Sequence, residues 1–276
     1  MDYRKSILVF GLFLGCSQAL ADDEAILDAI DSGAIKMDSE IAIPPSEEAA
    51  PAPAADDVPA PILDGAGLGL AISRAEEEDI TNRAFPLMSA KWPFNGAVVC
   101  WENPEAGSEA DRKIVHDAVV NSWEKYSQFR TRGWEKCTDQ TFGIRIRIDD
   151  VGPHAKFLGK YLAYNRAGQK TVVRDGMVLN FTFNNWSQSC RGQRENCIKA
   201  IAVHEFGHAI GFAHEQNRPD TPGECTQKPQ GSSGDTLLTP WDPHSVMNYC
   251  HDMYGTGGAL SELDIKAVMY IYGPPE

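Results

Sequence analysis

The chain has 276 residues, of which 42% are hydrophobic, so it is long enough for one sizeable domain with an extension or for two small domains. Its formal net charge of -14 comes almost entirely from residues 22–80, which hold 16 acidic and 2 basic side chains, while residues 81–276 are close to neutral. A near-neutral region of that size gives no support for binding to nucleic acids or anionic membranes, so neither is an expected partner.

The first 21 residues have the layout of a secretory signal peptide. Two basic residues precede an apolar run over residues 7–14, and a small-residue cleavage site at residues 19–21 follows. The run is too short to be a transmembrane segment, and no later stretch is apolar enough to span a bilayer. The sequence therefore predicts secretion to a periplasmic or extracellular compartment. A second interpretation stays open, in which Cys16 becomes a lipid anchor of the kind found in lipoproteins.

Residues 22–84 form an acidic leader that is rich in proline and alanine and has no aromatic residue. Such a segment cannot bury enough apolar surface to offset the entropy lost on ordering, so we expect it to be disordered. It is either a propeptide or a linker. Residues 22–99 contain no cysteine, so a thiolate from the leader cannot block a metal site.

The folded domain is expected to span residues 85–276 and to begin with a strand over residues 96–101. Ser108 and Asp111 then form a start of the capping-box type for a helix. Apolar residues recur at helical spacing from this point to Tyr126, which indicates a helix that packs against a core.

Two further strands are predicted where apolar residues alternate with polar ones, over residues 142–149 and 177–183. In the first of these, Arg145 and Arg147 are predicted to lie on the solvent-exposed face. The stretch between them, residues 157–173, has a looser pattern that could hold two short strands.

A pattern of three histidines follows the last predicted strand. On a helix, His204 and His208 are four residues apart and share one face, so that both can bind one metal ion. Gly211 is where this helix must end, because a further turn would carry His214 away from that face. Three neutral imidazoles leave one position of a zinc ion open, which is the catalytic arrangement. Glu205 is then the predicted general base for a water molecule on that zinc.

The spacing H-E-x-x-H-x-x-G-x-x-H, with Met247 in a downstream Ser-Val-Met-Asn-Tyr turn, resembles the metzincin zinc proteases. Glu215 directly after the third histidine, followed by Gln-Asn-Arg-Pro-Asp, is similar to the astacin branch of that clan. The resemblance covers roughly residues 85–276. It implies an α+β fold with two subdomains: a mixed twisted sheet with long helices above a cleft, and a smaller, irregular C-terminal subdomain with the methionine turn and a terminal helix.

The same resemblance implies roles for single residues. Tyr249 would bind the resting zinc and then stabilise the oxyanion of the transition state, while Met247 would pack beneath the metal. Glu215 would bind the mature N-terminus after activation. The implied function is that of a secreted zinc endopeptidase with one zinc ion per chain and protein or peptide substrates. The alternatives are a non-catalytic, secreted zinc-binding adhesion module on the same scaffold, and a matrixin-like or serralysin-like branch.

The C-terminal part is rich in glycine and proline through residues 219–243 and ends in a predicted amphipathic helix that begins after Ser261. Six cysteines remain once the signal peptide is removed, and an even number in an exported chain indicates disulfides, with 15 possible connectivities. Proximity along the sequence favours three pairs: Cys100 with Cys137, Cys190 with Cys197, and Cys225 with Cys250.

Overall fold

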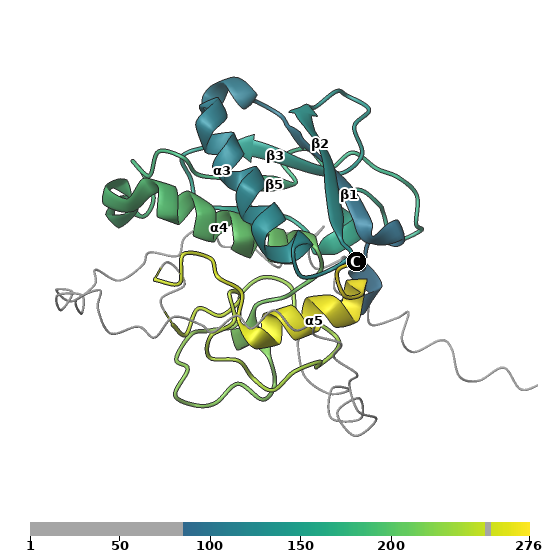
Figure 1. Cartoon of the computed structure of the whole chain (residues 1–276), viewed down its shortest axis with the longest axis vertical. Helices are drawn as coiled ribbons and strands as arrows, with labels where there is room; N and C mark the ends of the chain where they lie inside the picture. Colours follow the sequence, from purple (N-terminus) through teal and green to yellow (C-terminus); the bar gives the residue numbers. More distant parts are fainter. Residues whose placement is uncertain (1–84, 252–254) are drawn as a thin grey trace, which may run out of the picture. The chain divides into compact units, whose positions relative to one another are not determined.

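The structure is a computed structural model that describes residues 85–251 and 255–276. The predicted signal peptide and leader, residues 1–84, lie outside the described residues. Figure 1 shows a sheet with the helices α3 and α4 beside it, and α5 in the C-terminal part. The strands are β1 (Gly96–Trp101), β2 (Arg130–Lys136), β3 (Ile144–Ile148), β4 (His154–Ala155) and β5 (Met177–Leu179). The α-helices are α3 (Glu109–Val119), α4 (Arg194–Ala209) and α5 (Glu262–Tyr272). The short helical turns are η1 (Met88–Ala90), η2 (Pro93–Asn95), η3 (Pro104–Ala106), the π-helical η4 (Val120–Glu124), η5 (Gly159–Leu162), η6 (Gln188–Gln193) and η7 (Glu215–Asn217).

The five strands form one mixed sheet in the order β2-β1-β3-β5-β4. All neighbouring pairs are parallel except β4 and β5, which are antiparallel, with His154 opposite Val178. The short strand β4 is therefore an edge of the sheet. The mixed sheet combined with long helices confirms the expected α+β fold class.

The helix α3 begins as its sequence predicts. Ser108 accepts a hydrogen bond from the backbone of Asp111, whose side chain accepts one from the backbone of Ser108 in return, so the capping box is complete. The helix continues into η4, where the indole of the fully buried Trp123 donates a hydrogen bond to the carbonyl of Val203 at 2.8 Å. This bond ties the first helix to α4 through the core.

The helix α4 is buried on every side from Ala200 to its end, and apolar residues there surround His204, Glu205 and His208. It ends in a Schellman motif, in which the N–H of Phe212 bonds to the carbonyl of Gly207 and the N–H of Gly211 bonds to that of His208, each at 2.9 Å. Gly211 has φ 110°, which a residue with a Cβ rarely adopts. The helix therefore ends where the sequence predicts.

The last carbonyls of α4 receive hydrogen bonds from other parts of the chain. The indole of Trp92 donates to Ala209 at 2.6 Å, and the hydroxyl of Tyr272 donates to Ile210 at 2.7 Å. Because Tyr272 is the last residue of α5, the terminal helix is anchored at the end of the histidine helix. Between η7 and α5 the described residues form neither helix nor strand, which matches the irregular C-terminal subdomain that the sequence predicts.

One prediction about the sheet is wrong. Arg145 is expected on the solvent-exposed face, but it is 2% exposed and forms an ion pair with Glu102 at 2.6 Å. Its guanidinium also donates to the carbonyls of Thr138 and Thr141, because the loop before β3 folds over this face of the strand. Arg147 is exposed, as expected.

The strand predicted over residues 177–183 is shorter in the structure, since β5 ends at Leu179. The side-chain oxygen of Asn180 accepts hydrogen bonds from the backbones of Thr182 and Phe183, each at 2.9 Å, and this turn replaces the ladder. The looser stretch over residues 157–173 holds η5 and one isolated bridge rather than two strands.

All three predicted disulfides are present, linking Cys100 to Cys137, Cys190 to Cys197 and Cys225 to Cys250. The second closes the turn that leads into α4, and the third ties the irregular loop to the methionine turn. A search of the described part of the chain finds no helix with the length and apolar character that crossing a membrane requires.

Candidate metal centre

The three predicted metal ligands come together in the structure. His204 and His208 project from the last turns of α4, and His214 follows the turn at Gly211. The Nε2 atom of His214 lies 3.2 Å from that of His204 and 3.1 Å from that of His208. All three side chains are buried, with no more than 8% of each residue exposed. Among the described residues, this is the one group of metal-binding side chains that converges on a point.

Each of these histidines has its outer ring nitrogen hydrogen-bonded to a backbone carbonyl. The Nδ1 atom of His204 lies 2.8 Å from the carbonyl of Val246, and that of His208 lies 2.8 Å from the carbonyl of Phe212. His214 bonds in the same way to Gln230, at 2.9 Å. A carbonyl can only accept, so each Nδ1 carries the proton and each Nε2 presents a lone pair.

This donor set fits a metal ion. Burial lowers the pKa of His204 to about 3, with the nearby His214 ring adding to the effect, and burial lowers the pKa of His214 to about 4. Burial also lowers the pKa of His208 well below its usual value. The rings are therefore neutral, and three lone pairs face one another with no hydrogen between them. A cation can bind all three lone pairs at once, and three neutral imidazoles are a catalytic zinc set.

Glu205 lies in the same turn of α4 as the first histidine. The backbone of Ala155, on the edge strand β4, lies near its carboxyl group and opposes part of the rise in its pKa. The other carboxyl oxygen, Oε2, is buried and has no partner among the described residues. Burial raises the pKa of Glu205 to about 8. The side chain thus has a buried oxygen that is available for a proton.

Tyr249 reaches the cluster from the methionine turn. Its hydroxyl donates to the Nε2 atom of His204 at 2.9 Å, and its ring stacks on that histidine with centroids 5.0 Å apart. The backbone N–H of Tyr249 donates to the side-chain oxygen of Gln216 at 3.2 Å. Gln216 is 2% exposed, and its side-chain nitrogen has no partner within the part of the chain that the structure describes.

The methionine turn packs directly against α4. Met247 is 2% exposed, and a Cβ built on Gly207 would lie 2.3 Å from its sulfur, so the helix needs a glycine there. The turn is held by Asp264 of α5, whose carboxylate accepts hydrogen bonds from the Ser245 hydroxyl at 2.7 Å and the Val246 N–H at 2.9 Å. Because the carbonyl of Val246 binds His204, this carboxylate supports the metal centre from behind.

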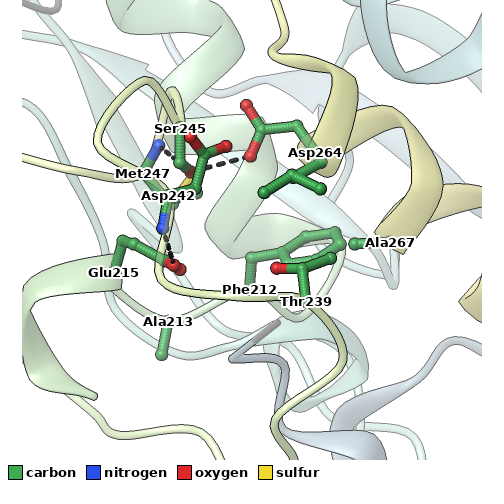
Figure 2. A pocket seen from close by; sticks show the side chains of 10 residues that line it. Phe212, Ala213, Glu215, Thr239, Asp242, Ser245, Met247, Asp264 and Ala267 are labelled. Atoms are coloured by element: carbon green, nitrogen blue, oxygen red, sulfur yellow. Dashed lines mark hydrogen bonds between the residues drawn. The ribbon is translucent and has the colours of Figure 1, made fainter. Parts of the chain in front are cut away.

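Glu215 lies behind the cluster rather than in it. Figure 2 shows it beside Asp242 and Met247 in a small pocket that also includes Asp264. Its carboxylate accepts the N–H of Asp242 at 2.9 Å and pairs with the fully buried guanidinium of Arg218 at 3.1 Å. Burial raises the pKa of Glu215 to about 8, although Arg218 opposes that shift. The N-terminal residues that it is expected to bind lie outside the described residues.

Four further residues lie near the centre, and the sequence alone predicts no contact with it for any of them: Ala155, Gln216, Asn217 and Asp264. They contact the predicted residues or their carbonyl partners across long stretches of chain. Gln216 and Asn217 directly follow Glu215, but sequence spacing does not predict that their side chains contact Tyr249 and Gln230.

Comparisons with known proteins point to the same segment. A family model described as Astacin, a family of peptidases, matches residues 187–226. The zinc metalloproteinase nas-19 of Caenorhabditis elegans is 35% identical over 109 residues, which are 35% of this chain and 25% of that protein. The zinc metalloproteinase nas-36 of Haemonchus contortus is 42% identical over 90 residues, which are 28% of this chain and 15% of that protein. The matches therefore span a quarter or less of these two relatives.

Among solved structures, that of myroilysin aligns with 70% of this chain and 100% of its own, at 18% identity and a TM-score of 0.46. The residues matched by the family model include η6, α4 and η7, and thus all three histidines and both glutamates of the pattern. Over the segment that supplies its three histidines, the chain is therefore similar to the astacin family of peptidases.

Proposed function

We propose that this chain is a secreted, zinc-dependent endopeptidase that hydrolyses peptide bonds of protein or peptide substrates. One observation carries the proposal. Three buried imidazoles converge through their unprotonated nitrogens, and the adjacent glutamate in the same helix has one carboxyl oxygen without a partner among residues 85–251 and 255–276. A purely structural zinc site would need four protein ligands and no such base.

The proposed roles follow from the contacts. His204, His208 and His214 would hold one zinc ion, which supplies an open coordination position, lowers the pKa of water and polarises a carbonyl group. Glu205 would take a proton from the attacking water on its free oxygen and return it to the leaving amine. The hydroxyl of Tyr249 would donate a hydrogen bond to the oxyanion that forms.

The edge strand β4 is the proposed support for the substrate backbone. Its one sheet partner among the described strands is β5, so its other edge is open. The backbone of Ala155 in that strand lies near Glu205, whose pKa it lowers. A peptide added to this edge as a further strand would run past the base, in the manner of other peptide-binding sheets.

We also propose that the chain is exported and that a leader precedes its catalytic domain. Three disulfides in one chain favour an oxidising compartment, in agreement with the signal-like residues 1–21. Residues 22–84 would then be a propeptide or linker ahead of a catalytic domain over residues 85–276. If the leader confers latency, a carboxylate or a backbone oxygen must do so, because the leader has no cysteine.

The test compares the purified chain with Glu205→Gln, which preserves the size of the side chain and removes the base. We expect the parent to bind zinc and to cleave casein or gelatin until a chelator is added. The variant should keep its zinc and lose about 100-fold or more of its activity. Unchanged cleavage by the variant would refute the mechanism. Zinc binding by the parent without cleavage, even after the leader is trimmed, would favour the non-catalytic binding module instead.

A further inference from the structure

The outer N–H of His214 has an acceptor of a different kind from those of the other two histidines. It donates to the carbonyl of Gln230, which belongs to residues 219–243, where the structure describes neither helix nor strand. The other two acceptors belong to the capped end of α4 and to the methionine turn that Asp264 holds. An acceptor in an irregular loop needs another contact to keep its position.

Asn217 provides that contact. Its side-chain nitrogen donates to the carbonyl of Gln230 at 2.7 Å, and its side-chain oxygen accepts the N–H of the same residue at 2.8 Å. The same nitrogen also donates to the carbonyl of Ser232, at 3.3 Å. Asn217 ends η7, three residues after His214, so a short turn connects the clamp to the ligand that it serves.

The loop lies against the imidazole ring. A Cβ built on Gly231, which has φ 63°, would be 3.9 Å from the Nδ1 atom of His214. The carbonyl of Gln230 has two lone pairs, and it accepts one hydrogen bond from His214 and one from Asn217. Asn217 therefore fixes the direction of this carbonyl group, and the carbonyl group in turn fixes the orientation of the His214 ring.

We propose that Asn217 is a positioning residue for the metal centre: by clamping the backbone of Gln230, it keeps His214 in the tautomer and orientation that present Nε2 to the metal. This inference rests on the proposed zinc site. Outer partners of metal-binding histidines act in this way in general, and their loss typically lowers metal affinity about 10- to 100-fold.

Two substitutions test the proposal. Asn217→Ala removes all three hydrogen bonds of the clamp, and Asn217→Leu removes them while keeping the shape of the side chain and adding no charge. Asn165→Ala is the matched control, because Asn165 clamps the backbone N–H of Gln169 at 2.9 Å in an exposed turn away from the histidines. The measurements on each purified full chain are zinc affinity by chelator competition, the visible absorption spectrum with Co²⁺, and the thermal unfolding of the metal-free protein.

We expect both Asn217 variants to bind zinc about 10- to 100-fold more weakly than the parent, with an altered Co²⁺ spectrum. The Asn165→Ala control should match the parent in zinc affinity and in the Co²⁺ spectrum. A merely structural role would change the unfolding of the metal-free protein and leave the metal spectrum as it was. Zinc affinity and a Co²⁺ spectrum equal to those of the control would overturn the proposal. If the parent itself binds neither zinc nor cobalt, the metal site fails and the clamp with it, which is a separate result.

Discussion

Tyr249 makes two kinds of contact that can be separated by mutation. Its ring stacks on His204 and lies against His214, with centroids 5.0 and 4.7 Å apart. Its hydroxyl, in contrast, points toward the nitrogen where the metal is expected. A phenylalanine at this position keeps the packing of the rings and removes the hydroxyl.

We therefore expect Tyr249→Phe to lower kcat by about 10²- to 10³-fold, the usual effect of losing one hydrogen-bond donor to an oxyanion. KM should change little, because the hydroxyl acts mainly in the transition state. Steady-state kinetics on a fluorogenic peptide measure both constants. Tyr270→Phe is the control, since that tyrosine is 52% exposed on α5. A kcat equal to that of the control would show that Tyr249 has only a packing role.

The residues that can be predicted from the sequence are those whose roles depend on local spacing. His204 and His208 are four residues apart on one helix, so periodicity alone places them together, and Glu205 directly follows the first of them. The contacts of Asn217 and Arg145 cannot be predicted in this way. Their partners lie 13 and 43 residues away along the chain, and amide or guanidinium groups of this kind are more often solvated.

At the scale of elements, the metal centre depends on the contact between α4 and the methionine turn. A Cβ on Gly207 would lie 2.3 Å from the sulfur of Met247 and 3.1 Å from the ring of Trp123. Glycine costs about 1 kcal/mol relative to alanine inside a helix. The close approach of the two elements outweighs that cost, because both neighbouring side chains are buried and have little room to move.

Gly207→Ala should therefore lower the free energy of unfolding by up to about 2 kcal/mol, which is the usual overpacking penalty of about 1–3 kcal/mol less the roughly 1 kcal/mol that alanine gains in a helix. Gly192→Ala serves as the control, because a Cβ at that position would meet nothing within 4 Å. Chemical denaturation of both variants gives the comparison. If Gly207→Ala were as stable as the control, the turn would not be pressed against the helix as the structure has it.

The ends of helices and strands are predicted best where a single residue has a clear role in starting or stopping the element. Gly211 ends α4 and Ser108 begins α3 because each satisfies backbone groups that the helix leaves open. The end of β5 differs from the prediction, since the alternating pattern continues to Phe183. There the side chain of Asn180 competes for the backbone hydrogen bonds, and an alternating pattern does not report such competition.

At the scale of the whole molecule, acidic groups are distributed in two different ways. The leader carries most of the net charge, whereas the folded part keeps a few carboxylates buried behind the methionine turn. Asp264 is one of these, and it joins α5 to the turn that supports His204. Burial raises the pKa of Asp264 from 3.8 to about 6, against the effect of the hydrogen bonds that it accepts.

This shift makes stability depend on pH. The unfolded aspartate ionises near pH 3.8, while the folded one keeps its proton to about pH 6. The contribution of Asp264 to stability is therefore fully present below pH 3.8 and is lost as the pH rises through about 6. A shift of this size corresponds to about 3 kcal/mol.

Asp264→Asn isolates that contribution. With its amide oriented so that the oxygen accepts from Val246 and Ser261, the side chain can donate to Ser245, so packing is retained. The histidines titrate alike in both proteins, and their effect cancels in the difference. We expect the parent, measured by denaturation at a series of pH values, to lose about 3 kcal/mol relative to the variant between about pH 4 and pH 7. A difference that stays constant over this range would mean that Asp264 is ionised throughout, and that its hydrogen bonds outweigh its burial.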